Sequence, residues 1–155
     1  MTELEQYLTD WLTDRGYELE VHECDDEFFY CDPLSFIAVA TSATTVDKHF
    51  LRFIYDHGCN FTFSNAFIPM FMHEIGHDEM NCLFDDDEWE EYREFEHSFE
   101  GVNMDNYANQ VRYMSHPIEL AATSWAIDYI NEHPEEIAAM ADRLNQIFAE
   151  RNTAL

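Results

Sequence analysis

The chain has 155 residues, a common size for one folded domain, and we therefore expect a single domain over residues 1–155. Hydrophobic residues make up 46% of it, with 13 Phe, 8 Tyr and 3 Trp, which argues against a disordered chain. Its 33 acidic and 7 basic residues give a formal net charge of -26, which argues against direct binding to nucleic acid or anionic membranes. The simplest interpretation is a solvated acidic surface, with adaptation to salt, mimicry of DNA and drift in composition as alternatives. In each case the negative electrostatic potential of the protein favours the binding of cations and of basic partners.

The sequence offers no segment for membrane insertion or export. The longest apolar run, residues 67–72, contains Pro69 and is far shorter than the roughly 20 residues that span a bilayer. The acidic N-terminus lacks the basic and apolar regions of a signal peptide, so we expect a cytoplasmic protein. Four cysteines lack CxxC spacing and are predicted to be free thiols: Cys24, Cys31, Cys59 and Cys82.

The first part of the chain predicts one helix and a small sheet. Apolar residues in 3–14 recur at helical spacing, and the helix should end at Gly16. Residues 17–24 alternate weakly, as a half-buried strand does, and two further apolar segments, 28–31 and 36–40, also read as strands. We expect these segments to form a short antiparallel sheet.

From residue 45 onward the pattern is helical. Val46, Phe50 and Phe53 share a face of one helix, which should stop at His57-Gly58. Four more helices are predicted, over residues 66–80, 85–100, 118–131 and 135–150. Ser64 or Asn65 can cap the first of these four. The helix over 85–100 is very acidic with one apolar face.

Residues 73–77 read His73-Glu74-Ile75-Gly76-His77, the HExxH pattern. Two histidines at i and i+4 of a helix project side by side, so both imidazoles can bind one Zn²⁺. Glu74 then lies beside the metal and can accept a proton as a general base. Such a short pattern also occurs by chance in helices whose histidines merely cap or pack. The apolar turn before the motif and the unfavourable Gly76, which suggests the close approach of a strand, favour the metal site.

A catalytic zinc needs a third protein ligand and an open position. Metzincins are excluded because Met80 and Leu83 stand where that class has Gly and His. A thermolysin-like spacing of about 20 residues lands on His97, with Glu94 and Glu96 beside it, and this region stays an alternative.

The favoured third ligand is Glu119, which lies 42 residues after His77 (119 − 77) in an otherwise apolar helical segment. A carboxylate buried there unpaired would be costly, and a metal would remove that cost. The alternative is an acidic residue placed in the first helical turn by the helix dipole. Tyr113 and His116, just upstream, are candidate catalytic residues that stabilise an oxyanion, although they can equally be a packed Tyr and a capping His.

The HEIGH segment followed by Glu119-x-x-Ala122-x-x-Trp125-Ala126 resembles the ImmA/IrrE family of gluzincin metallopeptidases, over roughly residues 36–130. The resemblance implies that His73, His77 and Glu119 bind zinc and that Glu74 activates water. It also implies a role in phage or mobile-element biology. The gap between the motif halves is longer than is usual in that family. Thr123 stands where thermolysin-like relatives have an Asp that orients a histidine, so that partner is unassigned.

We therefore predict an α+β, zincin-like domain with a short antiparallel sheet and about five or six helices, one of them carrying the HExxH motif. The predicted function is a zinc metallopeptidase acting on a protein or peptide, with a basic substrate favoured by the charge. One alternative is an acidic zincin-fold protein that binds a partner with little turnover. Another is structural zinc, for which Cys82 is the nearest fourth ligand. The sequence does not indicate an oligomeric state.

Overall fold

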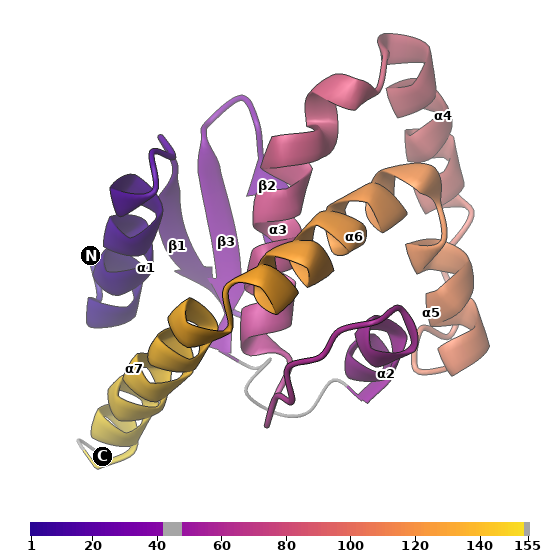
Figure 1. Cartoon of the computed structure of the whole chain (residues 1–155). Coiled ribbons are helices and arrows are strands. Elements are labelled where there is room, and N and C mark those ends of the chain that lie inside the picture. The colour runs from indigo at the N-terminus through magenta and orange to yellow at the C-terminus, as the bar shows by residue number, and fades with distance from the viewer. Residues whose placement is uncertain (42–47, 154–155) are drawn as a thin grey trace.

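The computed structural model describes residues 1–41 and 48–153, which form an α+β fold (Figure 1). The strands are β1 (Glu20–Cys24), β2 (Phe29–Cys31) and β3 (Phe36–Ala40). The helices are α1 (Glu3–Asp14), α2 (Lys48–Asp56), α3 (Phe67–Met80), α4 (Asp86–His97), α5 (Tyr107–Met114), α6 (Pro117–Glu132) and α7 (Pro134–Thr153). A 3-10 helix, Asn81–Leu83, follows α3. The predicted α+β class is confirmed.

The sheet is mixed, so the prediction of an antiparallel sheet was wrong. Its strand order is β1-β3-β2, with β1 parallel and β2 antiparallel to β3. In β3 the residues from Ile37 to Ala40 are all buried, and this apolar strand takes the centre with a neighbour on each side. Residues 25–28 carry the chain from β1 to the far edge, and only β2 and β3 are joined as a hairpin.

The N-terminal helix α1 forms as its pattern predicts. Thr2 and Glu5 make a capping box at its start, and Leu4, Leu8 and Leu12 are fully buried on one face. That face packs beside β1 (Figure 1). Past the helix end, Gly16 has a φ of +86°, a conformation that glycine adopts without a steric penalty.

Helix α3 runs through the centre of the molecule, between the sheet and α6 (Figure 1). Every residue from Phe67 to Gly76 except Met70 is buried, as expected for a helix covered on several sides. Pro69 lies in its first turn, where a missing N–H costs nothing, and the Asn65 side chain accepts a hydrogen bond of 2.9 Å from the Phe67 N–H. Pro117 opens α6 in the same way. These two helices bring their sequence-distant residues together.

Seven α-helices lie in the described part of the chain, against the five or six predicted. The missed helix is α5, which an Asn106 side-chain cap begins, and which packs beside α2 and α6. The predicted helix from residue 45 is found as α2, while Val46 lies outside the described residues. The four cysteines are free thiols, as predicted. Across residues 1–41 and 48–153, none of the helices combines the length and apolar character needed to cross a membrane.

Candidate metal centre

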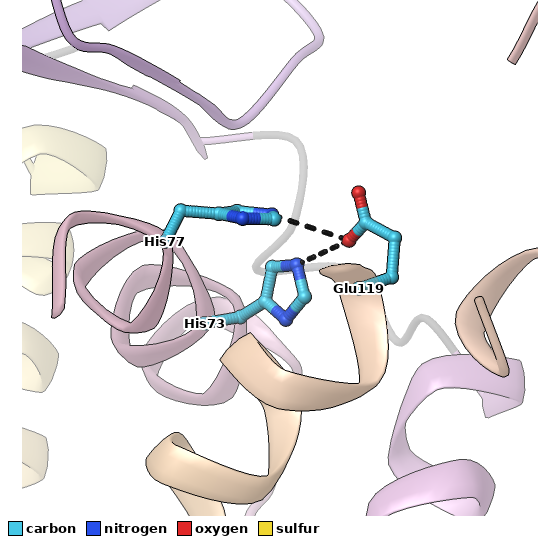
Figure 2. Close-up of side chains that lie close together, drawn as sticks. All are labelled: His73, His77 and Glu119. Atoms are coloured by element: carbon cyan, nitrogen blue, oxygen red, sulfur yellow. Dashed lines mark hydrogen bonds and ion pairs between the residues drawn. The ribbon is translucent and has the colours of Figure 1, made fainter. Parts of the chain in front are cut away.

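Two histidines of α3 and one glutamate of α6 converge on a single point (Figure 2). His73 and His77 lie one turn apart on the same face of α3, so their rings project together. The Nε2 atoms lie 2.8 Å (His73) and 3.2 Å (His77) from the same oxygen, Oε2 of Glu119. One ligand atom from each residue lies within 4.8 Å of the others, which makes the three side chains a group able to hold a metal ion.

A close approach of two helices sets this geometry. Gly76 lies between the two histidines on α3, and it faces the backbone of Ala122 on α6. A Cβ added at Gly76 would lie 2.3 Å from the Ala122 carbonyl oxygen, which only a glycine avoids. The expected close approach at this glycine therefore exists, but the partner is a helix and not the predicted strand.

Thr123 supplies the orienting partner that the sequence left unassigned. Its hydroxyl lies 2.8 Å from Nδ1 of His73, and its side chain is fully buried. A hydroxyl can donate or accept, so Thr123 holds the ring of His73 in either neutral tautomer. With Nδ1 engaged in this way, Nε2 points at Glu119. The residue that looked like a departure from the thermolysin-like pattern thus performs the same orienting task.

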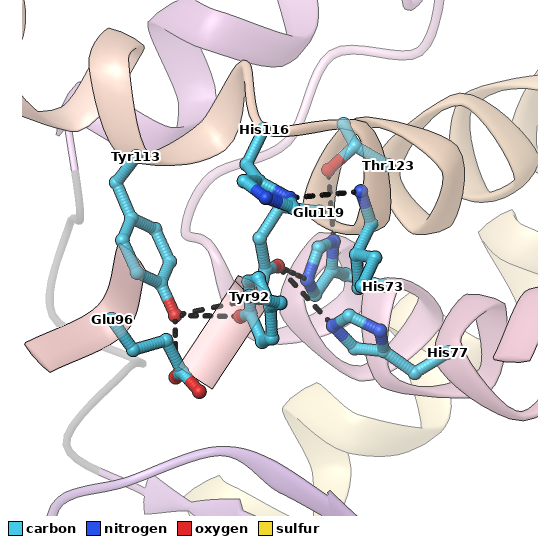
Figure 3. A network of polar contacts seen from close by, with 9 residues as sticks. His73, His77, Tyr92, Glu96, Tyr113, His116, Glu119 and Thr123 are labelled. Atoms are coloured by element: carbon cyan, nitrogen blue, oxygen red, sulfur yellow. Dashed lines mark hydrogen bonds and ion pairs between the residues drawn. The ribbon is translucent and has the colours of Figure 1, made fainter. Parts of the chain in front are cut away.

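Two tyrosine hydroxyls approach Glu119 from the other side (Figure 3). Tyr92, the buried residue of α4, donates a short hydrogen bond to Oε1 of Glu119. The Tyr113 hydroxyl lies 3.4 Å from the same oxygen and 3.0 Å from the Tyr92 hydroxyl, and it donates to Glu96 at 3.1 Å. Tyr113 thus reaches the site as predicted. Tyr92 was missed, although its place on the apolar face of a predicted acidic helix was a signal that its hydroxyl needs a buried partner.

Beside the ligand group of His73, His77 and Glu119 lies a cavity, and Glu74 forms part of its wall. Its side chain is only 8% exposed, and no hydrogen bond to its carboxylate occurs within residues 1–41 and 48–153. Every fully buried polar side-chain atom in that part of the chain has a partner, so the carboxylate oxygens of Glu74 open into the cavity. The cavity has a volume of about 530 Å³ and is also lined by His73, His77 and Glu119.

Burial and charge shift the protonation of these groups in different directions. Burial raises the pKa of Glu74, against the opposing pull of His73 and His77. Burial alone would also raise the pKa of Glu119, but hydrogen bonds from both histidines outweigh it and hold this pKa well below its usual value. Burial alone would lower the pKa of His77, but its hydrogen bond to Glu119 raises it. Glu119 is therefore a carboxylate, and Glu74 is the more basic of the two acids.

The other predicted candidates lie outside the ligand group. His116 caps α6, its Nδ1 accepting from the Ile118 N–H at 3.2 Å, and its ring packs against Tyr92 and Phe95. This leaves Nε2 as the only ring nitrogen for the predicted oxyanion role.

The alternative third-ligand region is on α4. His97 and Glu94 are exposed there, while Glu96 lines the cavity. Among the described residues, the ligand group contains Glu119 and none of these three. Cys82 is exposed and is not part of the group either.

The donor set fits a divalent metal that takes nitrogen and oxygen ligands. Bonds of 2.0–2.1 Å to a tetrahedral zinc separate neighbouring ligand atoms by about 3.3 Å. The two Nε2 atoms lie 2.8 Å and 3.2 Å from Oε2, so the carboxylate need retreat only by a few tenths of an ångström. The three side chains border an open cavity, and no fourth side chain of the described residues joins their group.

Comparison with protein-family models, with curated proteins and with solved structures finds no match. The structure itself thus shows an α+β protein with a largely buried His73–His77–Glu119 group that can hold a metal ion.

Proposed function

We propose that the protein is a zinc-dependent metallopeptidase of the gluzincin type, with a zincin-like fold. The observation that carries this proposal is the convergence of His73, His77 and Glu119 at a cavity into which Glu74 opens. The order His-Glu-x-x-His on one helix with a glutamate on a later helix is the arrangement of that class, and the resemblance to the ImmA/IrrE family supports the same assignment.

In the proposed reaction the three ligands, Glu74 and Tyr113 have separate roles. His73, His77 and Glu119 would hold a zinc ion, which when bound would supply Lewis acidity toward a substrate carbonyl. Glu74 accepts a proton from the attacking water and returns it to the leaving amine, and its raised pKa favours that exchange near neutral pH. Burial beside Glu119 raises the pKa of Tyr113, so its hydroxyl stays protonated, and its single proton, which it donates to Glu96 here, can turn to the oxygen on which charge develops. The side chains of Tyr92, Tyr113 and Glu119 line the cavity and limit the access of water to the reacting atoms.

A second candidate function is an acidic protein that binds a basic partner at this site with little turnover. The net charge of -26 favours it, and so does the position of α4, whose Tyr92 hydroxyl contacts Glu119 and partly covers the ligand group. The intact Glu74 favours catalysis, because a proton acceptor beside the ligand group is needed for hydrolysis and is not needed to hold a metal ion.

The first experiment is metal content by mass spectrometry, on the wild type and on Glu119→Ala, with His97→Ala as the control. We expect about one zinc per chain in the wild type and in His97→Ala, and loss of zinc in Glu119→Ala with unchanged circular dichroism. Zinc retained by folded Glu119→Ala would refute the ligand assignment.

The second experiment separates catalysis from binding. Glu74→Gln keeps the ligands and should bind zinc normally, but its peptide-bond hydrolysis should fall by at least about a hundredfold. A wild type that holds zinc yet cleaves nothing in a broad peptide library would overturn the peptidase and favour the binding protein.

A further inference from the structure

We propose that the cavity above the ligand group contains a subsite for a basic side chain, arginine or lysine, and that Glu96 determines this specificity. The proposal rests on the proposed function, because it names the substrate class of the same site. It concerns a part of the cavity that the ligands and the proton acceptor leave free.

The lining of the cavity combines negative charge with aromatic rings. Four carboxyl groups line it, those of Glu27, Glu74, Glu96 and Glu119, and its walls include Tyr30 and Trp89. No lysine or arginine of the described chain lines it. Aromatic faces and carboxylates together suit an organic cation, which is attracted to both, whereas a small hydrated metal ion favours oxygen ligands throughout.

Two of the four carboxylates remain for the substrate, Glu27 and Glu96, and of these Glu96 is held in place by a tyrosine hydroxyl. Glu119 is engaged by both histidines and by Tyr92, and Glu74 serves the reaction. The Tyr113 hydroxyl donates to Oε2 of Glu96 at 3.1 Å and fixes the carboxylate, whose remaining acceptor positions are open because Glu96 is exposed. A fixed carboxylate with free acceptors can receive two hydrogen bonds from a guanidinium group.

A second cavity, with a volume of about 750 Å³, lies beside α4 next to the first. The two cavities share the wall formed by Tyr30, Trp89, Tyr92 and Glu96. The second cavity is lined by three further carboxylates, those of Asp32, Asp86 and Glu90, and by one cationic side chain, Arg93. Glu96 thus lines both cavities, the one that holds Glu74 and the ligand group and the acidic one beside it.

The buried carboxylate of Glu74 also indicates that the cavity receives a ligand. It is nine-tenths buried, it opens into the cavity, and it has no hydrogen-bond partner in the described part of the chain. Such a group is costly unless a ligand or water completes its contacts.

The protein already uses the same recognition chemistry elsewhere. The guanidinium of Arg52 lies 3.9 Å from the centre of the Tyr107 ring, and its Nε lies 3.8 Å from the Asp56 carboxylate. Arg15 makes the corresponding pair of contacts with Trp11 and Glu136, at 3.8 Å and 3.4 Å. An aromatic ring beside a carboxylate therefore holds a guanidinium group twice within this fold.

The test uses four labelled decapeptides of one uncharged Gly-Ser-Ala background that differ only at the central residue, which is Arg, Lys, Gln or Glu. Binding is measured by fluorescence anisotropy with zinc-loaded Glu74→Gln, and cleavage is measured with zinc-loaded wild type. Glu96→Gln is then introduced, because the amide oxygen still accepts from Tyr113. Glu94→Gln is the matched control, since it removes the same charge from an exposed position of the same helix outside the cavity.

We expect the Arg and Lys peptides to bind more tightly than the Gln and Glu peptides. Glu96→Gln should weaken the binding of the basic peptides by about tenfold and leave the Gln peptide unchanged, while Glu94→Gln should cost less than about twofold. Glu96→Lys should shift the preference toward the Glu peptide. Equal losses in Glu96→Gln and Glu94→Gln, or no preference for basic peptides, would overturn the subsite.

The two proposals fail in different ways. Cleavage of all four peptides alike, unaffected at Glu96, would refute the subsite and leave the peptidase intact. Binding that depends on Glu96, in a zinc-loaded wild type that cleaves none of them, would support the subsite and count against the peptidase.

Discussion

Replacement of Gly76 by alanine tests whether the distance between α3 and α6 sets the geometry of the metal centre. The new Cβ would lie 2.3 Å from the oxygen, 2.9 Å from the carbonyl carbon and 3.0 Å from the Cα of Ala122. Ordinary contact begins at 3.4 Å, so the helices must separate by about 1.1 Å (3.4 − 2.3) at this point. All three opposing atoms are backbone atoms, so no side-chain rearrangement at Ala122 can relieve the clash.

The expected magnitudes follow from that separation. Overpacking of this kind costs about 3 kcal/mol, and alanine is about 1 kcal/mol better than glycine inside a helix, so the free energy of unfolding should fall by about 2 kcal/mol. The substitution should affect zinc binding more than it affects stability. His73 and His77 move with α3 while Glu119 moves with α6, and metal sites tolerate only about 0.2 Å in their bond lengths. Zinc affinity should therefore fall by at least about tenfold to a hundredfold.

Two measurements check this prediction. Urea unfolding in the presence of a chelator gives the stability, and competition with a chromophoric chelator gives the zinc affinity. Ser124→Ala is the control, because it changes an exposed position of α6 without touching α3. The double variant Gly76→Ala/Ala122→Gly should not recover zinc affinity. If Gly76→Ala binds zinc as the wild type does, the helix separation does not control the site.

Three further predictions concern single contacts. Tyr92→Phe removes the hydroxyl that contacts Oε1 of Glu119, and zinc affinity should fall by about tenfold, whereas the remote Tyr107→Phe should have no effect; equal affinities would refute this role for Tyr92. Thr123→Val leaves Nδ1 of the buried His73 without a partner, which should lower the free energy of unfolding by about 1–3 kcal/mol and weaken zinc binding, while Thr123→Ser should retain both. The Arg151 hydrogen bonds lower the pKa of Glu23, so this pair stabilises the fold above the unfolded-state pKa of about 4.3, and that contribution is lost as the pH falls through the lower folded-state pKa. In urea unfolding, Glu23→Gln should therefore be less stable than the wild type at pH 7, and the difference should vanish in acid; a difference independent of pH would contradict the linkage.

The sequence predicted best where a single periodicity decides the structure. Helices α1 and α7 were expected because their apolar positions repeat every three or four residues, and α3 and α6 because a capping residue or a proline marks their starts. The ligand residues were found for a related reason, since two of them lie on one helix at a spacing that fixes their relative position. The buried Glu119 was identified because a lone acid in an apolar helix needs a partner.

The sequence predicted least where neighbours come from distant segments. Alternation in β1 indicates a strand but not which strand lies beside it, and the central position of β3 follows from competition among all three. The apolar face of α4 was predicted, but the helix α5 was not. The chain between α4 and α5 decides which residues that apolar face contacts. For this reason Tyr92 could not be placed on Glu119 from the sequence. Thr123 was read as a missing Asp, because the orienting task of a hydroxyl shows only when its distance to His73 is known.

The position of the three candidate ligands relative to the core makes the proposed catalytic metal distinguishable from a structural one. The continuous apolar core includes residues from α1, β3, α3, α6 and α7, and the contact of α3 with α6 is made by Gly76, Ala122 and their apolar neighbours. The ligands lie at the edge of this core, beside the cavity, so the packing that places them does not depend on a metal. A chelator should then leave the circular dichroism intact and lower the stability only by the linkage term, RT ln(1 + [Zn]/Kd). A structural site behaves differently, because its binding energy is folding energy. Unfolding of the protein on chelation would therefore refute the catalytic interpretation, even if the three ligands proved correct.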